Sequence, residues 1–211
     1  MAAIRLTRTE RKERTRADLI EAARRVFLRN GFHAASLDAI AEEAGFTKGA
    51  VYSNFSSKDD LFLAVLTDYY DNQVRAYGEV LFEDETAEDA YRTAARVYIA
   101  TQSREPQWTP LVTEFTAHAS RREPLRLAVV AIRERFLDAI GELIAELGRR
   151  HGVEYLVPAR EVARGSGAMM RGMAVERLLD EEAVPPELFE ELHAAYMRGM
   201  ARNRTTESNE P

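Results

Sequence analysis

A run of residues from Thr47 to Lys58 combines side chains whose types suit contact with nucleic acid. A helix can approach base edges in a major groove, about 12 Å wide, when the residues facing the groove are small or polar. Such residues recur here within two helical turns: Lys48, Gly49, Ala50, Ser53 and Asn54. The pattern predicts a helix that presents this side to a DNA groove.

The same run also contains groups that could bind the sugar-phosphate backbone. Tyr52, Asn54 and Lys58 can donate hydrogen bonds to phosphates, and such contacts set the register of a protein on DNA and make its affinity depend on salt. Val51 and Phe55 are one turn apart and are expected to face inward, where they would hold the helix in place.

Two short helices before and within this run would position these groups. Ser36 is placed to cap a helix with apolar residues at Leu37, Ile40, Ala41 and Ala44, and Gly45 is expected to end it. Thr47 then caps the helix from Lys48 to Phe55. Two short helices joined by a glycine-containing turn form a helix-turn-helix, whose second helix enters the major groove.

A longer helix is expected before this pair, from about Thr9 to Asn30. Gly31 takes the left-handed position that ends many helices, and Phe32 can fold back on Phe27, a contact that accompanies this type of cap. Arg5, Arg8 and Arg11 at its start suggest an arm that adds phosphate or minor-groove contacts, although a solvated N-terminus is an equally good interpretation.

The stretch from Ala22 to Val65, AARRVFLRNGFHAASLDAIAEEAGFTKGAVYSNFSSKDDLFLAV, resembles the DNA-binding domain of the TetR family of bacterial regulators. The resemblance lies in the pattern G-F-x-x-x-S-x-x-x-I-A followed by T-K-G-A-x-Y-x-x-F-x-x-K-x-x-L. It implies that Thr47 and Lys48 lie at the groove, that Gly49 permits close approach, and that Tyr52 and Lys58 hold the DNA backbone. Asn54 departs from the histidine often found at its position. The full predicted set of DNA-binding residues is Ser36, Thr47, Lys48, Gly49, Ala50, Tyr52, Ser53, Asn54 and Lys58.

Helical periodicity continues through the rest of the chain, and no segment shows the alternation of a half-buried strand, so we predict an all-α fold. A capping box at Ser57 and Asp60 should open a long helix towards Tyr77. Later helices are expected at about 86–104, 109–122, 124–152, 158–180 and 186–202. We expect a helix-turn-helix domain over residues 1–56, a larger helical domain over 57–204 and a disordered tail over 205–211.

Composition excludes several classes of protein. The chain has 211 residues, 45% hydrophobic and 30% charged, and no cysteine, so disulfides, thiolate catalysis and cysteine-ligated metals are excluded. Residues 1–55 hold 10 Lys+Arg against 7 Asp+Glu, whereas the whole chain has a net charge of −6. A cationic head on an acidic body suits a protein whose head meets a polyanion. No stretch is long and apolar enough to span a membrane, and no secretory signal is evident, so we expect a cytoplasmic protein.

The TetR resemblance further implies that the larger domain binds a small effector and forms a homodimer through its last two helices. Side chains that could line the effector site are Tyr98, Trp108, Phe115, His118, Phe136, Met169 and Met173, although aromatic and Met residues at helical spacing are more often plain core. Interior glycines weaken the helix near residue 165, which suggests close packing against a symmetry mate or a kink there. The predicted dimer residues are Gly165, Ala168, Gly172, Leu188, Leu192, Ala195 and Tyr196.

These observations favour a DNA-binding transcriptional regulator, a repressor that a small molecule releases from its double-stranded operator. A helical adaptor that binds a protein partner through the same head is the alternative. No cofactor, metal site or enzymatic activity is predicted: Glu114 and His118 are one turn apart without a third ligand, and no nucleophile lies at a recognisable spacing from a base.

Overall fold

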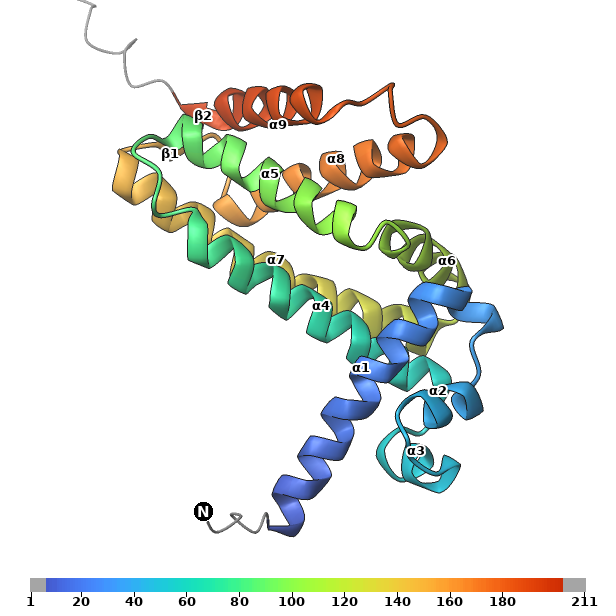
Figure 1. The fold of residues 1–211 in the computed structure, drawn as a ribbon. Helices are drawn as coiled ribbons and strands as arrows, with labels where there is room; N and C mark the ends of the chain where they lie inside the picture. The colour runs from blue at the N-terminus through green and yellow to red at the C-terminus, as the bar shows by residue number, and fades with distance from the viewer. Residues whose placement is uncertain (1–6, 203–211) are drawn as a thin grey trace, which may run out of the picture. The chain divides into compact units, whose positions relative to one another are not determined.

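A computed structural model describes residues 7–202 of the chain, and within that range the fold consists of nine helices and two very short strands (Figure 1). The helices are α1 Arg8–Ala34, α2 Leu37–Glu43, α3 Lys48–Asn54, α4 Lys58–Val80, α5 Ala87–Arg104, α6 Trp108–Ser120, α7 Glu123–His151, α8 Ala159–Leu179 and α9 Pro186–Met200. The strands are β1 Glu154–Tyr155 and β2 Ala201–Arg202. The all-α prediction is confirmed, and the expected tail over 205–211 lies outside the described residues.

The described residues form two compact units. Unit 1 contains residues 7–69 and 110–129, and unit 2 contains residues 70–109 and 130–202. This division by compactness differs from the sequence boundary at residue 56, because the first three turns of α4 and most of α6 pack with the helix-turn-helix. Sequence motifs alone do not reveal such packing between segments far apart in the chain.

The first helix begins at Arg8, one residue before the start expected at about Thr9. Thr7 caps α1: its hydroxyl accepts from the Glu10 N–H at 3.2 Å, and the Glu10 carboxylate accepts from the Thr7 N–H at 2.6 Å. The helical path breaks at Gly31, where φ is +75°, a conformation that favours glycine. Phe32 then stacks on Phe27 with ring centroids 5.9 Å apart, as the sequence predicts.

The turn between α2 and α3 has the geometry that its sequence indicates. Ser36 accepts from the Ala39 N–H at 3.1 Å and caps α2. Gly45, at φ +68°, ends that helix, and the next N–H, of Phe46, reaches back to the Ala41 carbonyl at 2.9 Å. Thr47 caps α3 by accepting from the Ala50 N–H at 3.2 Å. Local chemistry therefore fixes both short helices.

Four phenylalanines from three helices form the centre of unit 1. Phe62 of α4 lies between Phe27 of α1 and Phe115 of α6, with ring centroids 5.0 and 4.1 Å away, and Phe32 contacts Phe115 at 4.8 Å. All four rings are buried. Leu19, Val26, Ile40, Val51 and Phe55 extend this core under α2 and α3. Helices α2 and α3 thus pack on a core that contains a cluster of aromatic rings.

The start of α4 follows its predicted cap only in part. The Asp60 N–H donates to the Ser57 hydroxyl at 3.0 Å, as expected, but the Asp60 carboxylate accepts from the Ser56 N–H at 2.8 Å and from the Ser56 hydroxyl at 3.0 Å. The reciprocal half of the capping box is therefore displaced by one residue, because the carboxylate of a short side chain reaches the preceding serine.

In unit 2, α5 packs against α9 and α8 against α9. Ion pairs between arginines and glutamates join α5 to α9. The nitrogen–oxygen distance is 2.6 Å between Arg92 and Glu191 and 2.9 Å between Arg96 and Glu190. The two strands pair antiparallel, Glu154 opposite Arg202, and tie the end of α9 to the loop after α7. Two residues per strand are too few to leave a periodic pattern in the sequence. None of the helices in the described part of the chain is long and apolar enough to cross a membrane.

Candidate nucleic-acid interface and candidate ligand cavity

Helix α3 has one buried side and one open side. Val51 is fully buried and Phe55 is nearly so, and the Arg16 guanidinium lies 4.4 Å from the centroid of the Phe55 ring. On the other side Thr47, Lys48, Gly49, Tyr52 and Ser53 are exposed, and Ala50 and Asn54 are partly so. Tyr52 is 53% exposed although it is a large aromatic residue. The structure therefore brings the predicted groove-facing residues together on one accessible surface.

Nothing in the described part of the chain requires a glycine at position 49. A Cβ atom at this position would meet only the Thr47 hydroxyl, at 3.8 Å, which is an ordinary contact, and φ is not positive. The missing side chain leaves the backbone in the first turn of α3 open at this position.

Lys48 is exposed but engaged. Its ammonium lies 2.7 Å from the Asp38 Oδ1 atom and donates to Oδ2 at 2.9 Å, which links α3 to α2. The hydrogen bond to Asp38 raises the pKa of Lys48, so the side chain stays charged. Both side chains are more than half exposed, and an ion pair in that setting is weak and easily exchanged for a phosphate or a base.

Asn54 and Ser53 make local bonds rather than pointing freely outward. The Asn54 amide donates to the Ala50 carbonyl at 2.8 Å and to the Ser53 hydroxyl at 3.3 Å, and the Ser53 hydroxyl donates to the same carbonyl at 2.8 Å. Both N–H donors of Asn54 are therefore used inside the helix. In this conformation Asn54 has no donor left for the phosphate contact that the sequence suggests.

The structure also corrects the role predicted for Lys58. Its ammonium donates to the carbonyls of Phe32, His33 and Ala35 at 2.8, 3.0 and 2.9 Å, and lies 4.7 Å from the centroid of the Phe32 ring. An ammonium has three protons, and all three have a partner. Lys58 therefore fastens the end of α1 to the start of α4, and in this arrangement its ammonium has no proton left for the predicted phosphate contact.

A carboxylate secures the same segment from the other side. Glu114 of α6 accepts the Phe32 N–H and the His33 N–H, both at 2.9 Å. A Cβ at Gly31 would lie 2.9 Å from the Glu114 carboxylate, so a larger residue would displace that carboxylate in addition to adopting an unfavourable φ angle. Lys58 and Glu114 together hold the bend before α2, and neither role could be found from sequence spacing, because the partners are 23 to 82 residues apart.

The two residues considered for a metal have other partners. Glu114 binds the backbone as described, and the His118 ring lies 3.1 Å from the Asp59 carboxylate and 3.1 Å from the Arg122 guanidinium. In the described range, no three side chains of the metal-binding types gather together. Of the suggested arm, Arg8 and Arg11 are exposed residues in the first turn of α1, and Arg5 lies outside the described residues.

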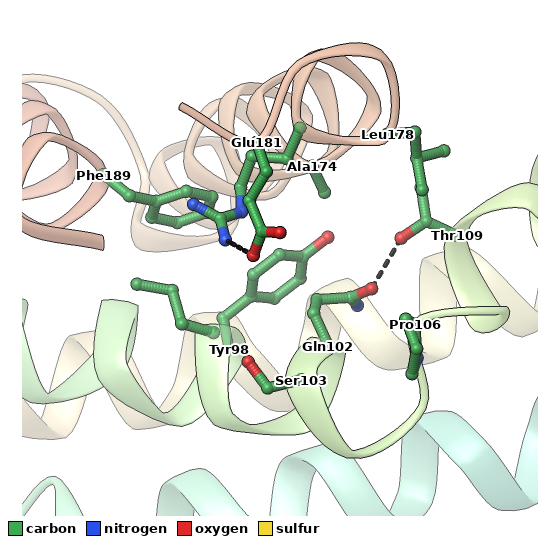
Figure 2. Close-up of a pocket in the computed structure, with 11 residues that line it drawn as sticks. Tyr98, Gln102, Ser103, Pro106, Thr109, Ala174, Leu178, Glu181 and Phe189 are labelled. Carbon is green, nitrogen blue, oxygen red and sulfur yellow. Dashed lines mark hydrogen bonds and ion pairs between the residues drawn. The ribbon is translucent and has the colours of Figure 1, made fainter. Parts of the chain in front are cut away.

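Unit 2 contains a cavity of about 160 Å³ near the C-terminal ends of α5 and α8 (Figure 2). Tyr98 lies among the lining residues shown there, and a hydrogen bond of 2.6 Å from Thr109 to Gln102 closes one side. Arg177 donates to Glu181 at 2.9 Å at the wall. The residues that line the cavity are Tyr98, Ile99, Gln102, Ser103, Pro106, Thr109, Ala174, Arg177, Leu178, Glu181 and Phe189.

The predicted effector residues do not form one group. Tyr98 lines the cavity, and Met169 and Met173 belong to the apolar cluster that includes Phe189 and Tyr98. Phe136 instead stacks on Tyr70 at 4.5 Å. Phe115 and His118 lie in unit 1, where Phe115 is core, and Trp108 is buried at the start of α6. The polar lining residues were missed because single Gln, Ser and Arg residues on helices carry no distinctive spacing.

Three glycines of α8 have three different surroundings. A Cβ at Gly165 would collide with the Tyr196 hydroxyl of α9, which donates to the Val162 carbonyl at 3.2 Å. Gly165 and Tyr196 therefore pack within one chain, which corrects the prediction that they meet a symmetry mate. A Cβ at Gly167 would lie 3.2 Å from the Arg171 guanidinium, whereas Gly172 faces open space. The helix runs through all three without a kink.

The other predicted dimer residues lie on an exposed face. On α8 the exposed small or apolar residues follow each other at steps of four, three and four: Ala168, Gly172, Val175 and Leu179. On α9 the same steps give Leu188, Leu192, Ala195 and Gly199. Leu179 is 84% exposed, and none of the atoms of residues 7–202 outside the helix backbone itself lies within 4 Å of a Cβ at Gly172 or Gly199. We name these eight residues the α8–α9 stripe.

Comparison with known proteins gives matches along most of the chain. Residues 19–65 match the family described as bacterial regulatory proteins, tetR family, and residues 87–202 match the family described as BetI-type transcriptional repressor, C-terminal. The chain is 34% identical over 142 residues to the HTH-type transcriptional activator FasR of Mycolicibacterium smegmatis, a match that covers 67% of this chain and 62% of that protein. The match thus spans less than two thirds of that relative's own length.

Solved structures share the fold at low identity. A putative TetR-family transcriptional regulator from Mesorhizobium loti superimposes with a TM-score of 0.72 at 22% identity, over 92% of this chain and 97% of that one. The regulator FadR from Bacillus subtilis, solved with stearoyl-CoA, gives a TM-score of 0.68 at 18% identity, over 85% of this chain and 98% of that one. The first family match covers the helix-turn-helix, and the second covers more than half of the chain. The protein therefore belongs to the TetR family of bacterial transcriptional regulators.

Proposed function

We propose that α3 enters the major groove of an operator and that its exposed face, Thr47 to Ser53, contacts the DNA. The observation that carries this proposal is the face itself: a large exposed tyrosine, an exposed lysine and a glycine that nothing in the described part of the chain requires lie together on a helix fixed by its caps. Tyr52 and Lys48 supply donors for phosphates or base edges, and Gly49 lets the backbone approach.

Selection of binding sequences from a random duplex pool tests this proposal, followed by affinity measurement at several salt concentrations. We expect an enriched sequence, and we expect Tyr52→Ala and Gly49→Leu to weaken binding to it without lowering the unfolding temperature. Glu21→Ala, an exposed change on α1, serves as the control. If the helix-turn-helix binds only protein partners, no DNA sequence will be enriched, and any residual binding of DNA will not depend steeply on salt.

The α8–α9 stripe supports a homodimer as the working form. Small and apolar residues follow the same steps on the exposed sides of two helices that pack against each other, and the two exposed glycines would allow close approach of a second copy. A twofold arrangement places the same face on both partners, which gives a four-helix interface. Two recognition helices could then meet successive turns of the major groove, about 34 to 36 Å apart.

Leu192→Arg tests the dimer, because it places a charge in the middle of the stripe. We expect a dimer of the wild type in sedimentation equilibrium, a monomer of Leu192→Arg, and much weaker operator binding by that variant. Leu127→Arg is the matched control, since Leu127 on α7 is at least as exposed as Leu192 and lies outside the stripe. A monomeric wild type, or a dimer unaffected by Leu192→Arg, would contradict the assignment.

The cavity of unit 2 supports the binding of a small effector that releases the protein from DNA, so that the protein acts as a repressor. The match of residues 87–202 to a repressor-type domain favours this direction. Helix α4 is continuous from Lys58, which holds the bend before α2, to Tyr77 in the core of unit 2, and it can therefore transmit a displacement. A promoter–reporter assay tests the direction of regulation. Deletion of the gene for this protein should raise reporter expression from a promoter that contains the operator, whereas a fall in reporter expression would identify an activator.

A further inference from the structure

Among the described residues, the charges that line the cavity of unit 2 compensate each other. The two charged side chains of the lining are Arg177 and Glu181, and they pair at a nitrogen–oxygen distance of 2.9 Å (Figure 2). The Arg177 guanidinium also donates to the Val184 carbonyl. A charged ligand would have to break this pair or leave its own charge without a counterion, and both are unfavourable where water is partly excluded. The lining therefore favours a neutral occupant.

Much of the remaining lining is apolar, and part of it is open to solvent. Ala174 and Phe189 are buried, whereas Ser103, Pro106 and Leu178 are exposed. A ligand can thus reach the cavity from solvent and bury an apolar body against the first two residues. The cavity volume of about 160 Å³ is close to the roughly 150 Å³ that holds one benzene molecule, so a single ring fits.

Tyr98 supplies a hydroxyl inside this cavity. Its ring stacks on Phe189 with centroids 5.7 Å apart and an interplanar angle of 22°, which restrains the direction of the ring. Figure 2 shows the hydroxyl pointing towards the space between Gln102 and Ala174. Within residues 7–202 this hydroxyl has no hydrogen-bond partner. Burial raises the pKa of Tyr98, so the phenol stays protonated and can both donate and accept.

We infer that the cavity binds a neutral molecule of one ring that carries a hydroxyl group, such as a phenol or a cyclic alcohol, and that this hydroxyl forms a hydrogen bond with Tyr98. The inference rests on the effector role proposed for unit 2 and names the chemical class of the effector. The ring of the ligand gains from burial against apolar side chains, and the hydrogen bond offsets the cost of removing its hydroxyl from water.

Four compounds that differ in one group on a benzene ring test the inference in the absence of DNA. Phenol, toluene, benzoate and benzylamine are titrated into the full chain at neutral pH by calorimetry, and the unfolding temperature is measured with each. Toluene is the more apolar of the two neutral compounds, so a cavity without a hydrogen-bond partner would prefer it. We expect phenol to bind at least as tightly as toluene, with a saturable rise in unfolding temperature, and neither charged compound to bind in this way.

Two variants locate the binding site. Tyr98→Phe removes the hydroxyl and keeps the stacked ring, so it should unfold at the wild-type temperature, bind phenol about three- to tenfold more weakly and bind toluene no more weakly. Tyr155→Phe is the matched control: it also removes a tyrosine hydroxyl from unit 2, but that hydroxyl lies 3.3 Å from the Tyr91 hydroxyl and Tyr155 is not a lining residue. Ala174→Leu reduces the cavity and should abolish binding of both neutral compounds.

Several results would overturn the inference. One is tighter binding of toluene than of phenol by the wild type, and another is saturable binding of benzoate or benzylamine. Failure of all four compounds to bind, or unchanged phenol affinity in Tyr98→Phe or Ala174→Leu, would do the same. A marked fall in the unfolding temperature of Tyr98→Phe would show that its hydroxyl has a structural partner. These readouts do not involve DNA: phenol that binds without releasing the operator would refute the effector role and leave the ligand class standing.

Discussion

Lys48 and Lys58 both lie in the predicted DNA-binding segment, but replacing each with methionine should affect a different property of the protein. Lys58 donates to three carbonyls at and just after the end of α1, whereas Lys48 is exposed and, among the described residues, pairs with Asp38 alone. Methionine keeps the length and apolar stem of lysine and removes the charge. We expect Lys58→Met to destabilise the fold and Lys48→Met to weaken DNA binding.

The size of the first effect follows from the bonds that are lost. A hydrogen bond from a charged donor contributes about 1.5–3 kcal/mol, but water can replace part of it where the carbonyl is accessible. The bonds to Phe32 and Ala35 are partly buried and the bond to His33 is exposed. We therefore expect Lys58→Met to lower the free energy of unfolding by about 2–4 kcal/mol, and the unfolding temperature by roughly 4–16 °C.

Thermal unfolding followed by circular dichroism measures this effect, and operator affinity is measured well below both transitions at several salt concentrations. Lys48→Met should keep the wild-type unfolding temperature, and its plot of log affinity against log salt should be shallower by about 0.9 if one phosphate contact is lost. The reasoning is refuted if Lys58→Met unfolds like the wild type and loses salt-dependent affinity as Lys48→Met does, because Lys58 would then be a DNA contact.

Three further changes probe other parts of the structure. Glu114→Ala leaves two backbone N–H groups without their acceptor and should reduce stability by about 1–3 kcal/mol in urea unfolding, with Glu114→Gln less affected; equal stability of all three proteins would show that the bend before α2 does not need the carboxylate. Gly165→Val forces a collision with the Tyr196 hydroxyl and should cost about 1–3 kcal/mol, part of which Tyr196→Phe should restore; no rescue would place the strain elsewhere. Burial lowers the pKa of His193 below its ordinary value of 6.5, so unfolding releases a site that binds protons more strongly, and stability should fall as the pH drops through 6.5 and below; His193→Gln should flatten this dependence, and an unchanged profile would assign it to other groups.

Features set by neighbouring residues could be predicted from the sequence. The caps at Ser36 and Thr47, and the turn at Gly45, involve groups no more than five residues apart, so residue type and spacing define them. The burial of Val51 beside the exposure of Tyr52 follows from helical periodicity in the same way. This explains why the fold class and the exposed face of α3 agree with prediction.

Features set by long-range packing could not be predicted. Lys58 and Glu114 find their partners only when α1, α4 and α6 come together, so a lysine next to a DNA-binding helix resembled a phosphate ligand. The predicted effector residues failed to group for the same reason: Phe115 completes the aromatic core of unit 1, while Tyr98 lines a cavity in unit 2. The aromatic type of a residue predicts that its side chain is buried, but it does not indicate in which of the two units the side chain is buried.

The glycines of α8 show where sequence reasoning reaches its limit. Interior glycines indicate that some group approaches the helix closely, but they do not identify that group. The structure gives three answers, the Tyr196 hydroxyl at Gly165, the Arg171 guanidinium at Gly167 and open space at Gly172. A pattern that suggested a single interface therefore combines packing inside the chain, room for a charged side chain and an exposed surface.

The central claim is that the exposed face of α3 binds duplex DNA, and the most direct test is affinity for a selected duplex measured by fluorescence anisotropy as salt is raised. We predict an enriched sequence whose affinity falls steeply with salt, and a Tyr52→Ala variant that stays folded but binds that sequence much more weakly. The claim would be contradicted by a folded protein that binds no duplex at low salt, or by a selected duplex that Tyr52→Ala and Lys48→Met bind as tightly as the wild type does.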